Sequence, residues 1–380
     1  MAPGRPDCPP GGRGRGGVKA GLGFILAVWA ALLPFARGSG AEPLGRTSAA
    51  VSFPSGPLSA GSSDSCVWSA GPPDSLRILF WNLENFFDFR NDSTSVSDAE
   101  FSSRGTRHWT RKRFYTKCNA VAKTLLWAGL PEIAAFAEVE NAFVLRRLVA
   151  ATPLYKSSYL PVHFDAPDPR GIDVGLLYRG DRLKLLESRP MHVYRPECPD
   201  SLLLTRDILL TRFLRRSSGF EFYLLVCHLP SKYGGVAASV PKRAAAVRRL
   251  RTLVDSLSGQ PTGAVAPILV CGDFNDTSDS PVFQLLTPSV ANLSERLAAR
   301  GEGTLRYAGQ WDLIDQFWVS PDQAETARMS ILRPPFLLTR DASHGGLKPL
   351  RTYSGPRYLG GVSDHLPVLL ALPPLLSLPP

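Results

Sequence analysis

Runs of consecutive apolar residues, each bounded by polar or turn-forming residues, recur along the chain from Leu76 to Leu372. Apolar runs of about four to eight residues between turn signals are typical of strands that are buried in a sheet. We expect strands at residues 76–82, 133–139, 172–179, 208–214, 220–229, 267–273, 313–320 and 364–372.

Two other segments repeat their apolar residues every three or four positions, which is the spacing of an amphipathic helix. The first, residues 110–129, begins at a candidate N-cap, Thr110, and ends at Gly129, a typical stop signal. The second covers residues 241–257 and has its arginines off the apolar stripe. Both segments are therefore predicted to be helices that cover a sheet with one face.

Two shorter helices are expected, one after Asn141 and one from Ser280 and Pro281, a pair that often begins a helix. Many strands with few helices between them argue against a regular parallel βαβ repeat. Two packed sheets covered by helices, an α+β architecture, fit the pattern better.

The N-terminal part of the chain does not share this pattern. Residues 1–41 join a basic start to an apolar run and then to small residues, as a secretory signal does. The alternative is an uncleaved membrane anchor, for which the run is short. Residues 42–74 are rich in Ser, Gly, Ala and Pro and are expected to be a flexible linker. We therefore expect an exported or membrane-anchored protein with one domain at residues 75–374 and a short tail at 375–380.

Charge and cysteine content narrow the function classes only slightly. The formal charge is +10, and it is +6 without residues 1–41, which hold five basic residues and one acidic residue. A basic surface favours polyanions such as nucleic acid or anionic lipid headgroups, but it does not identify one. Five cysteines lie beyond residue 41, and no CxxC or Cys/His spacing predicts a structural zinc site.

Polar side chains gather where the predicted strands end or begin. They are Asn82, Glu84, Glu138, Glu140, His228, Asp273, Asn275, Asp315, Asp364 and His365. Because strand ends on one rim of a sheet converge, these groups are predicted to share one site. Carboxylate and amide oxygens bind Mg²⁺ and Ca²⁺, and histidines transfer protons near neutral pH. The chemistry indicated is metal-assisted hydrolysis at phosphorus.

Each of these residues also has a simpler interpretation as a turn, a helix cap or a solvated rim residue. The ten residues lie at six strand ends or beginnings, and a simple explanation would have to hold at each of the six. A shared site is therefore the better hypothesis.

The order of the motifs resembles one known superfamily. The series WN, Glu138 after an apolar run, RGIDVGLLYR, TRD, CHLP, GDFN, LIDQFWVS and VSDHLP is similar to the endonuclease/exonuclease/phosphatase superfamily, over residues 76–373. WNLENFFD and DPRGIDVGLLYR resemble in particular its exported, little-characterised bacterial members. The resemblance implies a four-layer αββα sandwich, the deoxyribonuclease I-like fold. It also implies a phosphoesterase that uses Mg²⁺, Mn²⁺ or Ca²⁺.

The resemblance also implies roles for individual residues. Asn82, Glu138 and Asp364 match the metal-binding positions. Asp273 matches the residue that orients or deprotonates the attacking water, and Asn275 matches the amide that binds the scissile phosphate.

The two histidines match positions that contact the phosphate and protonate the leaving oxygen. His365 is expected to contact the phosphate or activate water, with Asp315 fixing its tautomer. His228 is expected to protonate the leaving oxygen, and Asp173 is the nearest candidate for its acidic partner. Arg206 matches an arginine that contacts the phosphate. The alternative role for Arg206 is a surface ion pair with Asp207.

Two loops are weaker candidates for substrate contacts. Residues 90–114 are basic near their C-terminal end, which suits either a polyanion contact or a solvated start of a helix. Residues 231–235 (SKYGG) could form a lid or an ordinary turn.

Three functions remain open at this point. A nuclease acting on DNA or RNA is preferred because of the basic chain, His228 and Arg206. A phosphatase or phosphodiesterase for phosphoinositides, sphingomyelin or small phosphoesters is the alternative. An inactive binding module is the least favoured, since every matched position holds a competent residue. We expect a monomer, and no protein partner is indicated.

Overall fold

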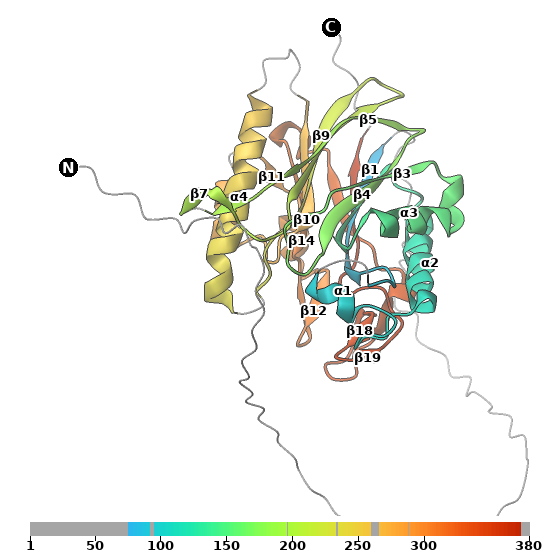
Figure 1. The fold of residues 1–380 in the computed structure, drawn as a ribbon. Coiled ribbons are helices and arrows are strands. Elements are labelled where there is room, and N and C mark those ends of the chain that lie inside the picture. The colour runs from blue at the N-terminus through green and yellow to red at the C-terminus, as the bar shows by residue number, and fades with distance from the viewer. Residues whose placement is uncertain are drawn as a thin grey trace, which may run out of the picture. The chain divides into compact units, whose positions relative to one another are not determined.

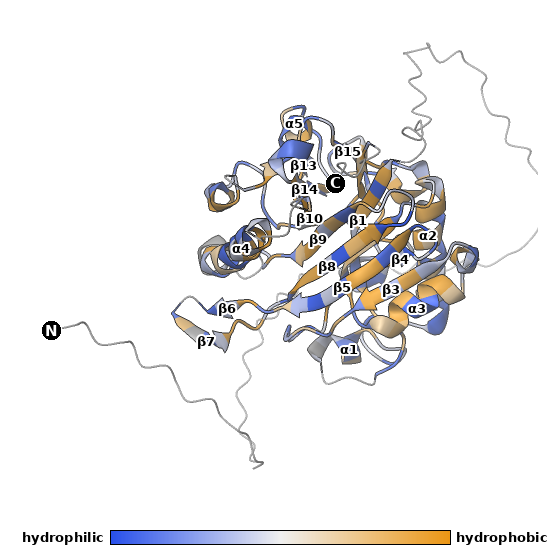
Figure 2. Ribbon diagram, turned by 90° about the horizontal axis from the view of Figure 1, so that it is seen from above, coloured by the Kyte–Doolittle hydropathy of each residue, from blue (hydrophilic) through white to orange (hydrophobic). Residues whose placement is uncertain are grey.

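The computed structural model describes residues 75–91, 95–195, 197–232, 235–259, 266–287 and 289–373. The predicted signal segment, the linker and the tail lie outside these residues. Within them, two six-stranded sheets pack face to face, and helices cover the outer side of each sheet (Figures 1 and 2). The expected four-layer αββα sandwich is therefore confirmed. No helix in the described segments is long and apolar enough to span a bilayer.

The first sheet has the strand order β15-β20-β1-β2-β4-β3. These strands are Arg328–Ile331, Val368–Leu372, Leu76–Phe86, Ile133–Val139, Asp173–Arg179 and Tyr159–His163. Strand β1 runs parallel to β2, and the other neighbours in this sheet are antiparallel.

The second sheet has the order β11-β14-β10-β9-β8-β5. Its strands are Ala291–Asn292, Asp315–Val319, Ile268–Asp273, Glu221–His228, Ile208–Arg215 and Leu183–Met191. Strand β10 runs parallel to β9, and the other pairs are antiparallel.

Three long helices form the outer layers. Helices α2 (Arg111–Trp127) and α3 (Ala142–Ala150) cover the first sheet, and α4 (Val236–Ser258) covers the second (Figure 2). Short helices and hairpins connect the layers. They are α1 (Val96–Glu100), η1 (Pro153–Lys156), β6 (Tyr194–Arg195), β7 (Cys198–Leu202), η2 (Pro281–Leu285), α5 (Glu295–Ala298), β12 (Leu305–Tyr307), β13 (Gln310–Asp312), η3 (Pro321–Gln323), η4 (Pro335–Leu337), β16 (Leu338–Arg340), β17 (Leu347–Pro349), β18 (Tyr353–Ser354) and β19 (Arg357–Tyr358).

The buried strands show why their sequences are almost continuously apolar. In β1, Leu79 and Trp81 pack against the α2 and α3 layer, whereas Ile78 and Phe80 pack between the two sheets. Alternate residues of a strand point to opposite faces, and here both faces are covered. A strand in the middle of this sandwich therefore needs apolar residues at every position.

Helix α2 agrees with its predicted signals. The Thr110 side chain accepts a hydrogen bond from the Arg113 backbone N–H, and the helix ends at Trp127 just before Gly129, whose φ is +72°. The side chain of Asn141 caps α3 in the same way, by accepting from Val144 N.

Other predicted boundaries were wrong. Helix α4 begins at Val236, so that Pro241 lies inside it and costs one backbone hydrogen bond. Ser280 and Pro281 begin a five-residue 3₁₀ helix without a side-chain cap instead of an α-helix. Strand β20 begins only at Val368, because Leu366 N donates to Thr304 O and draws the preceding residues out of the sheet.

Candidate active site

The candidate site lies where the central strands of both sheets end. Asp273, the last residue of β10, pairs in register with His228 on β9 and with Asp315 on β14. Residues paired across neighbouring strands project to the same face of a sheet. The second sheet therefore presents two carboxylates and a histidine side by side.

The first sheet meets this group through Asn82 on β1. Its side-chain Nδ2 donates to Asp273 Oδ2 at 3.0 Å and lies 3.5 Å from Glu138 Oε1. Backbone groups fix the amide, since Glu84 N donates to Asn82 Oδ1 at 2.9 Å. The predicted neighbourhood of Asn82, Glu138 and Asp273 is thus present, and it bridges the two sheets.

Unusual backbone conformations turn these side chains into the site. Glu84, Asn85, Glu138 and Asn275 have φ values of 48°, 54°, 61° and 52°, which lie in the left-handed region. Strands β1 and β2 both carry a register shift here, as bulges that redirect side chains do. Such a conformation costs about 1–3 kcal/mol for a residue other than glycine. The bulge also lets Asn85 N donate to Glu138 Oε2 at 2.7 Å.

His365 is held tightly by its neighbours. Its Nδ1 lies 2.8 Å from Asp315 Oδ2, its backbone N–H donates to Ser363 Oγ at 3.0 Å, and its carbonyl accepts from Trp81 Nε1 at 2.8 Å. Burial lowers the pKa of His365, but the charges of Asp315, Asp273 and Asp364 raise it well above its usual range. The raised pKa favours the imidazolium form of the ring, and the predicted pairing with Asp315 is confirmed.

Asp315 is fully buried and has a second partner. The Thr304 hydroxyl donates to the same Oδ2 that binds His365. Asp315 Oδ1 has no hydrogen-bond partner within the described part of the chain. Oδ2 of Asp315 is thus the oxygen that orients His365 and accepts from Thr304.

The carboxyl group of Asp273 has a raised pKa. Burial raises its pKa to about 7, the charge of Asp315 adds to this, and His365 and the hydrogen bond from Asn82 oppose it. Asn275 N also donates to Asp273 Oδ1 at 2.8 Å. A carboxylate with a pKa near neutrality is well suited to accept a proton from water.

His228 differs from His365 in charge. Its Nε2 lies 3.6 Å from Asp273 Oδ2, and its Nδ1 has no partner among the described residues. Burial lowers the pKa of His228 well below its usual range, and Arg206, Arg170 and His365 lower it further. The lowered pKa favours the neutral form of this histidine.

The predicted pairing of His228 with Asp173 was wrong. Asp173 Oδ2 lies 3.4 Å from His163 Nε2, and its Oδ1 accepts from Ala166 N at 3.0 Å. The reason is topological, because Asp173 and His163 lie on the neighbouring strands β4 and β3 of the first sheet, whereas His228 belongs to the second. The acidic neighbour of His228 is Asp273.

Arg206 is buried and its side chain is already engaged. It donates to Asp168 Oδ2 at 3.0 Å and to Leu229 O at 2.9 Å. Asn275 Nδ2 donates to the same carbonyl at 2.9 Å, so Arg206 supports the segment that holds Asn275. The alternative pairing with Asp207 was also wrong, since Asp207 binds His192 Nδ1 at 2.9 Å.

Arg170, which the sequence analysis did not select, is the exposed guanidinium beside Glu138. Its Nη2 donates to Asn85 Oδ1 at 2.8 Å and lies 3.9 Å from Glu138 Oε2. Its side chain is 44% exposed, against 7% for Arg206. A basic residue in the turn directly before β4, a strand that begins at the site, was the signal available in the sequence segment DPRGID.

A second charged group lies behind Asp364. Arg351 Nη2 is 3.0 Å from Asp364 Oδ2 and 3.0 Å from Glu84 Oε1. Glu84 accepts from Thr352 N at 2.7 Å, and the buried Lys117 Nζ donates to the Glu84 carbonyl at 2.8 Å. Burial raises the pKa of Glu84 to about 7 and lowers that of Lys117 to about 8. The sequence analysis missed Lys117 and Arg351.

The two weaker loops are largely used by the fold itself. Arg113 lies 4.2 Å from the Tyr358 ring centroid, and Arg107 lies 5.4 Å from that of Tyr353. In the other loop, Lys232 Nζ is 2.8 Å from Asp276 Oδ1, while Tyr233 lies outside the described residues. Asp276 also faces the buried Arg243 at 3.3 Å, so it is a structural residue.

Three groups of side chains are candidates for holding a divalent cation. His163, Asp165 and Asp173 form one, on and next to β3 and β4 of the first sheet. Asp273, Asp315 and His365 form another, but the raised pKa of His365 favours its protonated form and both carboxylates are almost fully buried. Glu138 and Asp364 have side chains that are 12% and 28% exposed, which leaves room for the water ligands that Mg²⁺ retains. Of the predicted ligands, Glu138 and Asp364 therefore fit a hard cation better, whereas Asn82 would have to turn its Oδ1 from Glu84 N toward the cation.

Sequence comparison places most of the chain in one family. Residues 77–373 match the Endonuclease/Exonuclease/phosphatase family. Nocturnin of Drosophila melanogaster is 23% identical over 222 residues, a segment that makes up 55% of this chain and 30% of the fly protein.

Solved structures share the fold at low sequence identity. The catalytic domain of human Nocturnin, solved with a bound sulfate anion, has a TM-score of 0.50 at 18% identity and covers 78% of this chain and 94% of that one. An endonuclease/exonuclease/phosphatase family protein of Bacteroides thetaiotaomicron has a TM-score of 0.51 at 17% identity, with 78% and 97% covered. The mannosyl-6-phosphatase Bt3783 of the same species has a TM-score of 0.50 at 16% identity, with 78% and 98% covered.

Proposed function

The chain belongs to the endonuclease/exonuclease/phosphatase family, whose members are phosphoesterase hydrolases, and from this premise we propose that it is a divalent-cation-dependent phosphodiesterase that cleaves nucleic acid. The observation that carries this proposal is the geometry around Asp273, which lies 3.6 Å from His228 Nε2 and accepts from Asn82 at 3.0 Å, beside a His365 ring held by Asp315 at 2.8 Å. Burial raises the pKa of Asp273 to about 7, while the pKa of His365 is raised by its neighbouring carboxylates and that of His228 is lowered by burial.

In the proposed reaction Asp273 accepts a proton from the attacking water. The Nε2–H of His365 donates to the phosphate, where it stabilises the charge that develops in the transition state. We assign the protonation of the leaving oxygen to His365 as well, because the lowered pKa of His228 makes that ring a poor acid. His228 then helps to shape the floor of the site next to Asp273.

The remaining groups would neutralise and position the phosphate. A divalent cation at Glu138, Asn82 and Asp364 would supply positive charge to a phosphate oxygen. Arg170, which is half-exposed, would add a guanidinium contact to the phosphate from the solvent side. Asn275 would hold Asp273 in place through its backbone N–H. In this proposal Arg206 acts only through the loop that carries Arg170 and through Leu229.

Positive charge beside the site supports an anionic substrate, and nucleic acid is the one that we prefer. Arg170 and Arg351 lie beside the candidate cation ligands, and the formal charge of the chain is +10, or +6 without residues 1–41. Residues 1–41 support the further proposal that the enzyme is exported, with membrane anchoring as the alternative.

The test is a parallel assay of the purified chain with Mg²⁺, Mn²⁺ or Ca²⁺ on plasmid DNA, RNA, phosphoinositides, sphingomyelin and bis(p-nitrophenyl) phosphate. We expect nucleic acid and the small diester to be cleaved, and all turnover to stop in excess chelator. The variant Asp273→Asn should lose activity by at least about 100-fold, because it removes the general base.

Cleavage of a lipid substrate alone would show that the nuclease assignment is wrong. Full turnover in chelator would exclude the cation. An active Asp273→Asn enzyme would mean that the site lies elsewhere.

A further inference from the structure

A pocket of about 520 Å³ opens next to the candidate site, and we call it the side pocket. Its walls come from the loop before β4, from the β6–β7 hairpin and the residues after it, and from the first turns of α4. The residues used below are Pro169, Arg195, Leu203, Leu204, Pro241 and Lys242. Ligand sites in proteins usually have volumes of about 300–1,000 Å³, so this one has room for a ligand.

The side pocket and the candidate site share a wall. Pro169 lines the pocket, and the next residue, Arg170, donates to Asn85 and lies 3.9 Å from Glu138. Successive Cα atoms are only about 3.8 Å apart. The loop that carries both residues thus contributes to the pocket and to the candidate site, which makes the pocket a candidate for the group next to a phosphate bound beside Glu138 and Arg170.

A second link runs through Arg206. Leu204 lines the pocket two residues before Arg206, whose guanidinium binds Asp168 and shares the Leu229 carbonyl with Asn275. The buried ion pair between Arg206 and Asp168 thus fixes the pocket wall relative to Asn275. This gives the buried arginine a role that does not require contact with the phosphate.

The lining combines apolar surfaces with positive charge. Leu204 is 59% exposed, although burying it would be favourable, and Pro169 and Pro241 add rigid apolar surfaces. Arg195 and Lys242 outnumber the single acid of the lining, Glu197. The fitting occupant has a flat apolar part and carries a negative charge of its own.

We propose that the side pocket binds the nucleotide adjacent to the scissile phosphate, with its base against Leu204 and the prolines and its own phosphate near Arg195 and Lys242. This inference rests on the proposed function and narrows it to diesters within a nucleic-acid strand. A phosphoinositide headgroup is polar throughout and would leave Leu204 unused. The cationic choline of sphingomyelin would be repelled by Arg195 and Lys242.

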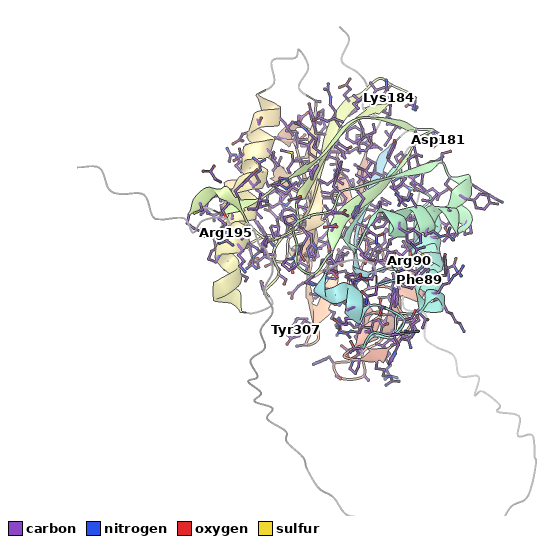
Figure 3. The ribbon with its side chains drawn as sticks, in the orientation of Figure 1. Phe89, Arg90, Asp181, Lys184, Arg195 and Tyr307 are labelled. Atoms are coloured by element: carbon purple, nitrogen blue, oxygen red, sulfur yellow. The ribbon has the colours of Figure 1, made fainter. Side chains whose placement is uncertain are left out.

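The experiment compares two substrates on the full chain. Single-stranded dT12 offers nucleotides on both sides of each scissile phosphate, whereas bis(p-nitrophenyl) phosphate has one phosphate and no neighbour. The variants are Leu204→Asp and the double variant Arg195→Glu/Lys242→Glu. The controls, Leu160→Asp and Lys184→Glu, carry the same changes at the strand ends far from the site, and Figure 3 shows Lys184 and Arg195 well apart.

We expect both pocket variants to raise KM for dT12 by about tenfold or more, which corresponds to the loss of about one good contact, with kcat little changed. The KM for bis(p-nitrophenyl) phosphate should stay within about twofold, which also shows that the variants are folded. The salt dependence of KM for dT12 should weaken by about 0.7 in log–log slope for each lost phosphate contact. The two controls should behave like the original chain.

An unchanged KM for dT12 in both pocket variants would overturn the inference. A rise in KM for phosphoinositide or sphingomyelin vesicles without one for dT12 would also overturn it, because the occupant would then be a lipid headgroup. If neither dT12 nor the small diester is cleaved, the proposed function fails. Fluorescence anisotropy of labelled dT12 with the original and variant chains would then test separately whether the side pocket contributes to binding. Equal affinities for the original and both pocket variants would overturn the inference.

Discussion

Asp273 shows how the position of one carboxyl group sets its chemistry. Burial and the nearby Asp315 outweigh the imidazolium of His365 and raise the pKa of Asp273 from 3.8 to about 7. A group with a raised pKa binds more protons in the folded chain than in the unfolded chain between these two pH values. Its stabilising contribution is therefore complete below about pH 4 and is lost as the pH rises through about 7.

This predicts a pH dependence for the free energy of unfolding. In excess chelator, the original chain should lose stability between pH 4 and 8 relative to Asp273→Asn, by at most about 4 kcal/mol. Urea unfolding at several pH values measures the difference. Asp279→Asn, a change in the exposed turn that follows, should keep the original slope. Equal slopes for Asp273→Asn and the original chain would show that Asp273 is not buried in this way.

The sequence predicted which residues belong to the candidate site better than it predicted which of their side chains are exposed. The order of motifs was enough to bring Asn82, Glu138, Asp273 and the His365–Asp315 pair together. It could not choose between Arg206 and Arg170, because that depends on Asp168 turning toward Arg206 and burying it. Nor could it find the partner of His228, which follows from which sheet each strand joins.

At the scale of elements, the β12–β13 hairpin holds the His365 loop in place. Leu305 on β12 forms a bridge with His365, Leu366 N donates to Thr304 O at 2.9 Å, and the Thr304 hydroxyl donates to Asp315. The hairpin thus fixes both members of the histidine–carboxylate pair. Thr304 is a positioning residue in this arrangement.

Thr304→Val should weaken that arrangement without removing a group that touches substrate. The buried Asp315 would lose one hydrogen bond, at a cost of about 1–3 kcal/mol in stability. We expect kcat for bis(p-nitrophenyl) phosphate to fall by about tenfold, its KM to stay nearly constant, and the pH optimum to shift as His365 is reoriented. Thr304→Ser keeps the hydroxyl and should have the stability, the kcat and the pH optimum of the original chain. A valine variant with the original pH profile would argue against the role of the hairpin.

The central elements were predictable and the edges were not. Strands such as β2 and β10 are apolar up to the polar residues at their ends, Glu138 and Asp273, because helices cover one face and the other sheet covers the second. The edge strands β5 and β3 were missed, since LKLLESRPM mixes charges with leucines and YLPVH contains a proline. The β1 and β2 bulges leave only a weak signal, because Glu84 and Glu138 are not typical residues for positive φ and Asn85 alone is.

At the scale of the whole described domain, the candidate site joins the two sheets. Asn82 and Glu138 come from the first sheet, and Asp273, His228 and Asp315 come from the second. A cation bound by Glu138, Asn82 and Asp364 should therefore stabilise the folded state. The increase is about 2.7 kcal/mol when the free cation is at 100 times its dissociation constant.

Thermal unfolding with and without Mn²⁺ tests this prediction without any substrate. The Tm of the original chain should rise with Mn²⁺, and Glu138→Gln should lose most of that rise. Glu221→Gln, at the opposite end of β9, should keep it. The same rise in all three proteins would place the cation elsewhere.

The position of β20 governs when this enzyme can become active during its synthesis. Val368–Leu372 lies between β15 and β1 in the first sheet, next to one of the earliest strands of the domain. A nascent chain that has made everything up to β15 still has an open gap beside β1, and His365 has not yet emerged. Completion of the first sheet must therefore wait for this long-range pairing, which is typical of slow folding steps. We expect a chain interrupted before residue 368 to be inactive.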